Sequence, residues 1–176
     1  MDTRSRYVFS LIAGTTLLCA CDRPTPLPTA TRTLPIDGPN RTAAVGYVNT
    51  RIARTNLGVI NYKANLDQFN VELKTHDDAD IEVTHGVAEA GGNTGWHYHP
   101  GPVLVMVETG SLTVYHADDP TCTGTTYNAG STFIEGTTPH FVRNEGAITS
   151  EIIGVFFVPA GKPRRIESGV PGNCPF

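Results

Sequence analysis

The feature that most constrains the fold is the segment 91–102, in which a His-Tyr-His triplet lies between glycines. Successive side chains of a β-strand point to opposite faces, so His97 and His99 share one face while Tyr98 points away. Neutral imidazoles are good ligands for transition metals, and His140 is the candidate for a third imidazole from another strand. The alternative interpretation of the pair is a polar edge strand with two solvated histidines.

Short apolar runs separated by turns extend along the whole second part of the chain. The clearest lie at 69–73, 81–85, 103–107, 111–116 and 152–158, and the chain contains 18 Gly and 13 Pro. The alternation at 69–73 predicts a strand with its apolar face inward, and in 81–85 His85 shares a face with Ile81 and Val83. The continuous apolar run 103–107 is typical of a strand buried on both faces, with a subunit contact as one way to cover the second face. Together these patterns predict an all-β protein, either a jelly roll or a barrel.

The two histidine segments resemble the two sequence motifs of the cupins. The first cupin motif begins with Gly, five residues and His-x-His, and it closes with a second Gly. Gly91, His97, His99 and Gly110 occupy these positions. The second motif ends Pro-x-Gly-x-x-His-x-x-x-Asn, and His140 and Asn144 match it, whereas Glu135 and Thr137 replace the Pro and the Gly. The resemblance covers roughly residues 57–160 and implies a cupin-like jelly-roll barrel, the double-stranded β-helix.

This chain departs from the first cupin motif at one functional position. The glutamate that many cupins add as a fourth metal ligand would fall at position 103, which is Val103, and Glu108 is expected to face out. The resemblance therefore implies a site of the three-histidine type, His97, His99 and His140, as in iron-dependent dioxygenases of thiols and diketones. Glu135 has two open interpretations: a catalytic base or extra ligand at the cavity, or an exposed turn residue.

Three functions remain open from the sequence. The first is a metal-dependent enzyme, of dioxygenase or related type, that uses a divalent Fe, Mn, Ni, Cu or Zn ion on a small organic substrate. The second is a non-catalytic module that binds or senses a small ligand, and the third is a structural role with incidental histidines. The formal charge of −4 and the lack of a basic stripe predict no nucleic-acid partner. The resemblance to cupins makes a homodimer plausible.

The first forty residues predict export. Residues 1–21 combine a positive start with a short apolar run, which is typical of a secretory signal peptide. The segment 18–21 resembles a bacterial lipobox in which Cys21 would be lipidated, with plain cleavage nearby as the alternative. Residues 22–40 are rich in proline and predict a disordered spacer, so 41–176 would be the single cupin-like domain. We expect a periplasmic or extracellular protein held at the membrane by a lipid.

Cys122 and Cys174 are the cysteines that remain after such processing. Two cysteines in an exported domain are expected to form a disulfide. The alternative is a free reactive thiol, for which the sequence offers no neighbouring activating histidine.

Overall fold

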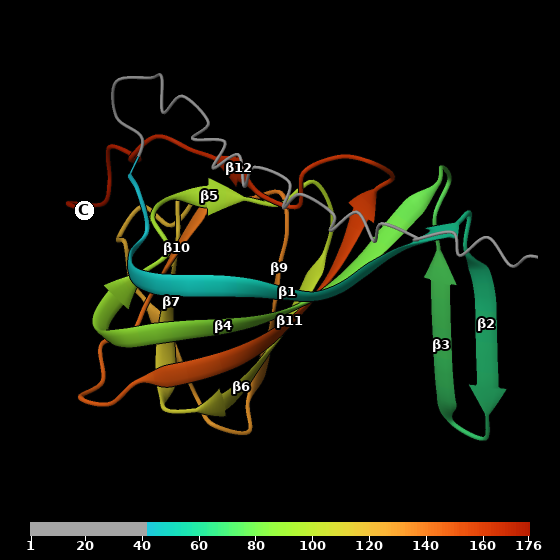
Figure 1. Cartoon of the computed structure of the whole chain (residues 1–176), viewed down its shortest axis with the longest axis horizontal. Coiled ribbons are helices and arrows are strands. Elements are labelled where there is room, and N and C mark those ends of the chain that lie inside the picture. The colour runs from blue at the N-terminus through green and yellow to red at the C-terminus, as the bar shows by residue number, and fades with distance from the viewer. Residues whose placement is uncertain (1–41) are drawn as a thin grey trace, which may run out of the picture. The chain divides into compact units, whose positions relative to one another are not determined.

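The computed structural model describes residues 42–176, and this part of the chain is all-β (Figure 1). The predicted signal segment 1–21, the predicted lipidation site Cys21 and the predicted spacer 22–40 lie outside the described residues. Within residues 42–176, no helix is long and apolar enough to cross a membrane.

The described residues contain twelve strands. They are β1 (Val45–Gly58), β2 (Asn61–Leu66), β3 (Phe69–Lys74), β4 (Ala79–Asn93), β5 (His97–Tyr98), β6 (Val103–Thr109), β7 (Ser111–His116), β8 (Thr125–Asn128), β9 (Thr132–Glu135), β10 (His140–Arg143), β11 (Ser150–Pro159) and β12 (Ile166–Glu167). All strand pairs are antiparallel, and ten of the strands form one sheet.

The ten-stranded sheet folds into two sides of a barrel. On one side β1, β4, β11, β6 and β9 are hydrogen-bonded in that order, and Figure 1 shows β1, β4, β11 and β6 side by side. On the other side the order is β12, β5, β10, β7 and β8. Strand β4 joins the sides, because its last residue Asn93 pairs with Arg143 of β10. The predicted all-β jelly-roll barrel is thus confirmed.

The apolar core lies between the two sides. Its buried members come from β4, β6, β7, β9, β10 and β11: Ala88, Val103, Val105, Val107, Leu112, Val114, Phe133, Val142, Ile152, Phe156 and Val158. Only one face of β6 contributes, since Leu104 and Met106 are both 38 % exposed. The single chain therefore buries one face of 103–107, and the subunit contact that would cover the other face stays a prediction.

The interior of the barrel is polar along β4. The predicted alternation at 81–85 is present, but Glu82 and Thr84 are the side chains that point in and are buried. His85 faces the outside, where its Nε2 lies 2.9 Å from an oxygen of Glu151. Polar residues are tolerated inside because Glu82 is paired with guanidinium groups, which compensates for the loss of water around its charge.

Strands β2 and β3 form a two-stranded sheet of their own. The expectation of a strand at 69–73 is confirmed, but the expectation of a buried apolar face is wrong, because Phe69 is 68 % exposed and Leu73 is 42 % exposed. The reason is that this hairpin pairs only with itself, so no second layer of the described chain covers its apolar face.

A disulfide fastens the C-terminal tail. Cys122 and Cys174 are bonded, with their Cα atoms 5.4 Å apart, as the sequence predicted. Cys174 is buried in a second small apolar cluster with Trp96 and Phe141, against which Phe176 packs. The indole Nε1 of Trp96 donates a hydrogen bond to a main-chain oxygen of Phe176. The tail therefore covers the segment that precedes His97.

Candidate metal centre

The three predicted histidines converge inside the barrel. His97 begins β5 and His140 begins β10, and the two residues are direct partners in the strand register. His99 follows β5 and faces the same interior. The ring centroids lie 4.4 Å apart for His97 and His140, 4.9 Å for His97 and His99, and 5.1 Å for His99 and His140. All three residues are buried.

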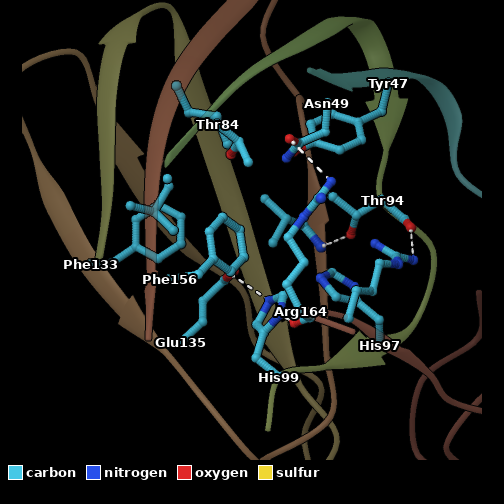
Figure 2. Close-up of a pocket in the computed structure, with 15 residues that line it drawn as sticks. Tyr47, Asn49, Thr84, Thr94, His97, His99, Phe133, Glu135, Phe156 and Arg164 are labelled. Atoms are coloured by element: carbon cyan, nitrogen blue, oxygen red, sulfur yellow. Dashed lines mark hydrogen bonds and ion pairs between the residues drawn. The ribbon is translucent and has the colours of Figure 1, made fainter. Parts of the chain in front are cut away.

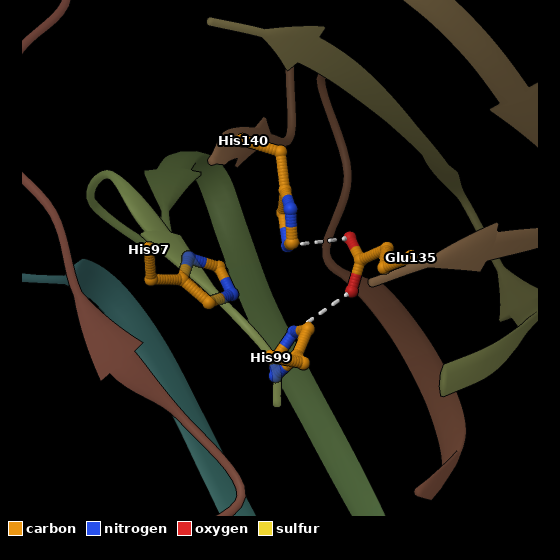
Figure 3. A group of neighbouring side chains, drawn as sticks. All are labelled: His97, His99, Glu135 and His140. Atoms are coloured by element: carbon orange, nitrogen blue, oxygen red, sulfur yellow. Dashed lines mark ion pairs between the residues drawn. The ribbon is translucent and has the colours of Figure 1, made fainter. Parts of the chain in front are cut away.

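Glu135 completes this group (Figure 3). Its carboxylate oxygens lie 3.3 Å from Nε2 of His99 and 3.4 Å from Nε2 of His140, and Glu135 is only 8 % exposed. One ligand atom from each of the four residues lies within 4.8 Å of all the others. The interpretation of Glu135 as an exposed turn residue is therefore wrong.

The strand register explains why this carboxylate occupies the site. Glu135 ends β9, and its partner across the ladder is Val103 of β6. Position 103 is where the cupin motif would place its own glutamate. The carboxylate thus comes from the neighbouring strand, at the same level of the barrel. Glu108 points outward as expected, where it approaches His85.

Backbone carbonyls orient all three imidazole rings. Nδ1 of His97 lies 2.9 Å from the carbonyl of Gly95, Nδ1 of His99 lies 2.7 Å from that of Arg164, and Nδ1 of His140 lies 2.8 Å from that of Thr138. A carbonyl only accepts, so each Nδ1 carries the proton. In the neutral imidazoles each Nε2 then presents a lone pair toward the centre, the tautomer that metal-binding histidines use.

A tight turn sets the position of His97. Gly95 has a φ of 67°, and a Cβ at this residue would collide with the carbonyl of Thr42. Its amide donates to the side chain of Asn93, while the amide of Trp96 donates to the hydroxyl of Thr42. Only glycine combines a positive φ with the absence of a Cβ, so only glycine fits this turn without strain. The turn therefore fixes the entry into the His-Tyr-His segment.

The buried polar atoms at the centre lack ordinary partners. Nε2 of His99, Nε2 of His140 and Oε1 of Glu135 form no hydrogen bond with any of the described residues. An unsatisfied buried polar group costs about 1–3 kcal/mol, and more when it is charged. Three such atoms that face one another fit a bound cation, because coordination would satisfy all of them at once. Nitrogen and carboxylate donors suit a divalent transition metal.

The electrostatics favour the metal-binding protonation states of His97 and Glu135, whereas at His140 a metal must compete with a proton. Burial holds the pKa of His97 well below its usual value, so this ring is neutral at pH 7. Burial alone would raise the pKa of Glu135, but the adjacent His140 and His99 outweigh it and hold that pKa below its usual range. Burial lowers the pKa of His140, and the carboxylate of Glu135 more than reverses this shift. A cation that replaces the His140 proton would be stabilised by the same carboxylate.

A small cavity opens beside the histidines (Figure 2). It has a volume of about 70 Å³, which is room for several waters or a small organic molecule. His97, His99 and Glu135 line one end of it. Further polar lining residues were not identified from the sequence: Tyr47, Asn49, Thr84, Thr94, Arg164 and Arg165. The one signal for them was the Arg164-Arg165 pair, considered only in connection with nucleic acid.

A second group of potential ligands lies outside the barrel interior. His85, Glu108 and Glu151 come from β4, β6 and β11, and none of them is buried. His85 already pairs with Glu151, so this group differs from the central one, whose atoms face one another without hydrogen bonds.

No family model matches the sequence, and no curated protein matches it. Among solved structures the chain is similar to an oxalate oxidase, with a TM-score of 0.42 and 23 % identity over 49 % of this chain and 45 % of that one. It is also similar to the polyketide cyclase RemF from Streptomyces resistomycificus, with a TM-score of 0.43 and 17 % identity over 53 % of this chain and 63 % of that one. A cupin-like protein from Thermotoga maritima gives a TM-score of 0.43 and 20 % identity over 51 % and 65 %.

The chain thus spans about half the length of the oxalate oxidase that it matches. The arrangement of strands and the four converging side chains of this chain carry the interpretation of the site.

Proposed function

We propose that this protein is a metal-dependent enzyme that acts on a small organic substrate, with the ion held by His97, His99, His140 and Glu135. The observation that carries the proposal is this group of four inward-facing side chains, in which Nε2 of His99, Nε2 of His140 and Oε1 of Glu135 are buried without hydrogen bonds to the described residues. Their Nδ1 atoms are meanwhile bound to carbonyls. Rings held in this way are prepared to coordinate an ion rather than to form internal hydrogen bonds.

The residues of the chain have separate tasks in this proposal. When bound, a divalent ion at this site would polarise a substrate oxygen, lower the pKa of a water molecule or, if it is a redox metal, supply electrons for oxygen chemistry. As a ligand, the carboxylate of Glu135 would balance part of the positive charge; the alternative role is a general base toward the substrate, if the carboxylate is not bound to the ion. Phe133, Ile152 and Phe156 form an apolar wall of the cavity.

Elemental analysis of the purified chain tests the proposal first. We expect close to one Fe, Mn, Ni, Cu or Zn ion per chain after dialysis. Oxygen consumption and product formation over a panel of small organic acids, thiols and diketones then separate an enzyme from a binding module. Bound metal without any turnover would favour the module, and a metal-free protein that takes up none of these ions would refute both.

Substituting Glu135 with glutamine is expected to weaken metal binding about 10- to 100-fold, because the amide keeps the shape and loses the charge. Competition titration with a metallochromic chelator measures the change. Glu72→Gln is the matched control, since Glu72 lies on β3 and contacts Lys63 instead. An unchanged affinity in Glu135→Gln would show that Glu135 is not a ligand.

We also propose that the chain is an exported lipoprotein. The Cys122–Cys174 disulfide supports export, because disulfides persist in oxidising compartments, and the lipid anchor is proposed from the sequence at Cys21. Replacing Cys21 with serine is then expected to move the protein from the membrane fraction to the soluble fraction. Fractionation followed by immunoblotting measures the distribution. If the distribution is the same for Cys21→Ser and the unmodified chain, the lipid anchor is ruled out.

A further inference from the structure

The end of the cavity away from the histidines is cationic and contains unused hydrogen-bond donors. Along β4, the inward positions Asp80, Glu82 and Thr84 are all polar. The carboxylate of Glu82 contacts the guanidinium groups of Arg51, Arg54 and Arg164 at 2.9, 3.1 and 2.6 Å. Arg54 also contacts Asp80 at 2.7 Å. Three arginines therefore share two carboxylates, and of these three Arg164 is the one that lines the cavity, where Arg165 is a second cation.

Thr84 presents an unpaired hydroxyl to the cavity. The residue is only 1 % exposed, and its buried Oγ1 has no hydrogen-bond partner in the described part of the chain. Gly154, on the neighbouring strand β11, leaves this hydroxyl free, because a Cβ there would lie 3.0 Å from Oγ1 and 2.8 Å from the ring of Phe156. An orphaned buried hydroxyl is costly, so its position beside a cavity suggests a ligand that satisfies it.

Arg164 connects the cationic end to the metal centre. Its guanidinium lines the cavity and lies 5.6 Å from the ring centroid of Phe156. Its main-chain carbonyl is the acceptor that orients His99. Figure 2 shows the Arg164 side chain extending past the imidazoles toward Asn49. Beside it, the hydroxyl of Tyr47 accepts a 2.8 Å hydrogen bond from the amide of Asn49, which leaves its own proton to be donated.

We infer that this end of the cavity binds a carboxylate, so that the substrate of the proposed enzyme is a small organic acid. Arg164 supplies the charge, and the hydroxyls of Thr84 and Tyr47 donate to the carboxylate oxygens. A second oxygen-bearing group of the same molecule then lies at the His97, His99 and Glu135 end. The cavity of about 70 Å³ limits the acid to a few non-hydrogen atoms. This inference rests on the proposed function for the reaction, but the carboxylate subsite is built from other side chains.

Isothermal titration calorimetry of the full chain tests the subsite with lactate and its neutral analogue lactamide, on metal-free and on Co²⁺-loaded protein. We expect lactate to bind at least about tenfold more tightly than lactamide in both forms, because a charged hydrogen-bonded group contributes about that much. Arg164→Gln and Thr84→Val are each expected to lower the lactate affinity about tenfold and to change the lactamide affinity by less than about twofold.

Two comparisons separate a ligand role from a structural one. Arg51→Gln removes a guanidinium that also contacts Glu82 but does not line the cavity, and it is expected to keep the preference for lactate. The melting temperature of ligand-free Thr84→Val is expected to be no lower than that of the wild type, since valine removes an unsatisfied hydroxyl. Equal affinities for lactate and lactamide in the wild type would overturn the inference. Lactate preference in a chain that takes up no metal would support the subsite and refute the proposed metal enzyme.

Discussion

Alanine at both His97 and His140 is expected to leave the purified protein without metal. The wild type should retain about one ion per chain after dialysis, and the double variant less than about a tenth. The reason is that the two substitutions remove two of the three inward-facing imidazoles. Glu135 and His99 would remain, and two ligands do not hold a transition metal against dialysis. Elemental analysis of both proteins measures the difference.

The same variant should lose the stabilisation that metal gives. At a free metal concentration about 1,000 times the dissociation constant, binding stabilises the folded wild type by about 4 kcal/mol, and the double variant should gain almost none. His76→Ala with His85→Ala is the matched control, because neither residue belongs to the central group and His85 faces the outside of the barrel. Circular dichroism checks that each variant is folded. A double variant that keeps its metal while folded would remove the basis of the proposed function.

Loss of the disulfide is expected to have the second large effect. Cys122 and Cys174 are separated by 52 positions, and in the chain-entropy account a crosslink over such a loop stabilises the folded state by about 4 kcal/mol. The double variant Cys122→Ser with Cys174→Ser should therefore unfold at a clearly lower denaturant concentration. The loss should be largest around the tail, since Cys174 packs with Trp96 and Phe141.

Fluorescence of Trp96, the one tryptophan of the chain, reports this unfolding directly. Trp96 is fully buried, and its indole donates a hydrogen bond to Phe176 in the tail. Reducing agent should lower the stability of the wild type to that of the double variant and leave the double variant unchanged. A difference below about 1 kcal/mol between the oxidised wild type and the variant would contradict the expected role of the crosslink.

Local sequence patterns predicted the elements that carry the histidines. That His97 and His99 share one face follows from the alternation of side chains along a strand alone, and in the structure both point to the interior. The same reasoning placed Glu108 on the outer face. The alternation does not say which face is interior, however. At 81–85 the interior face is the polar one, with Glu82 and Thr84. Paired guanidiniums from distant residues reverse the usual rule there.

The hairpin of β2 and β3 shows the same limit of sequence reasoning. Its alternation predicted a strand correctly, since period-two alternation follows from the extended backbone itself. Burial of the apolar face additionally requires a second layer, and strand pairing in this part of the chain supplies none.

The sequence by itself determined the all-β class, the shared face of His97 and His99 and the two cysteines that pair, because these depend on neighbouring residues or on the small number of candidates. Only the tertiary structure decided which carboxylate joins the histidines. Glu135 meets them because β9 pairs with β6 and sets Glu135 opposite Val103, thirty-two positions away in the chain. Likewise, the carbonyl that orients His99 comes from Arg164, far along the chain. Such contacts depend on the register between distant strands, which the packing of the whole barrel fixes and which no local pattern contains.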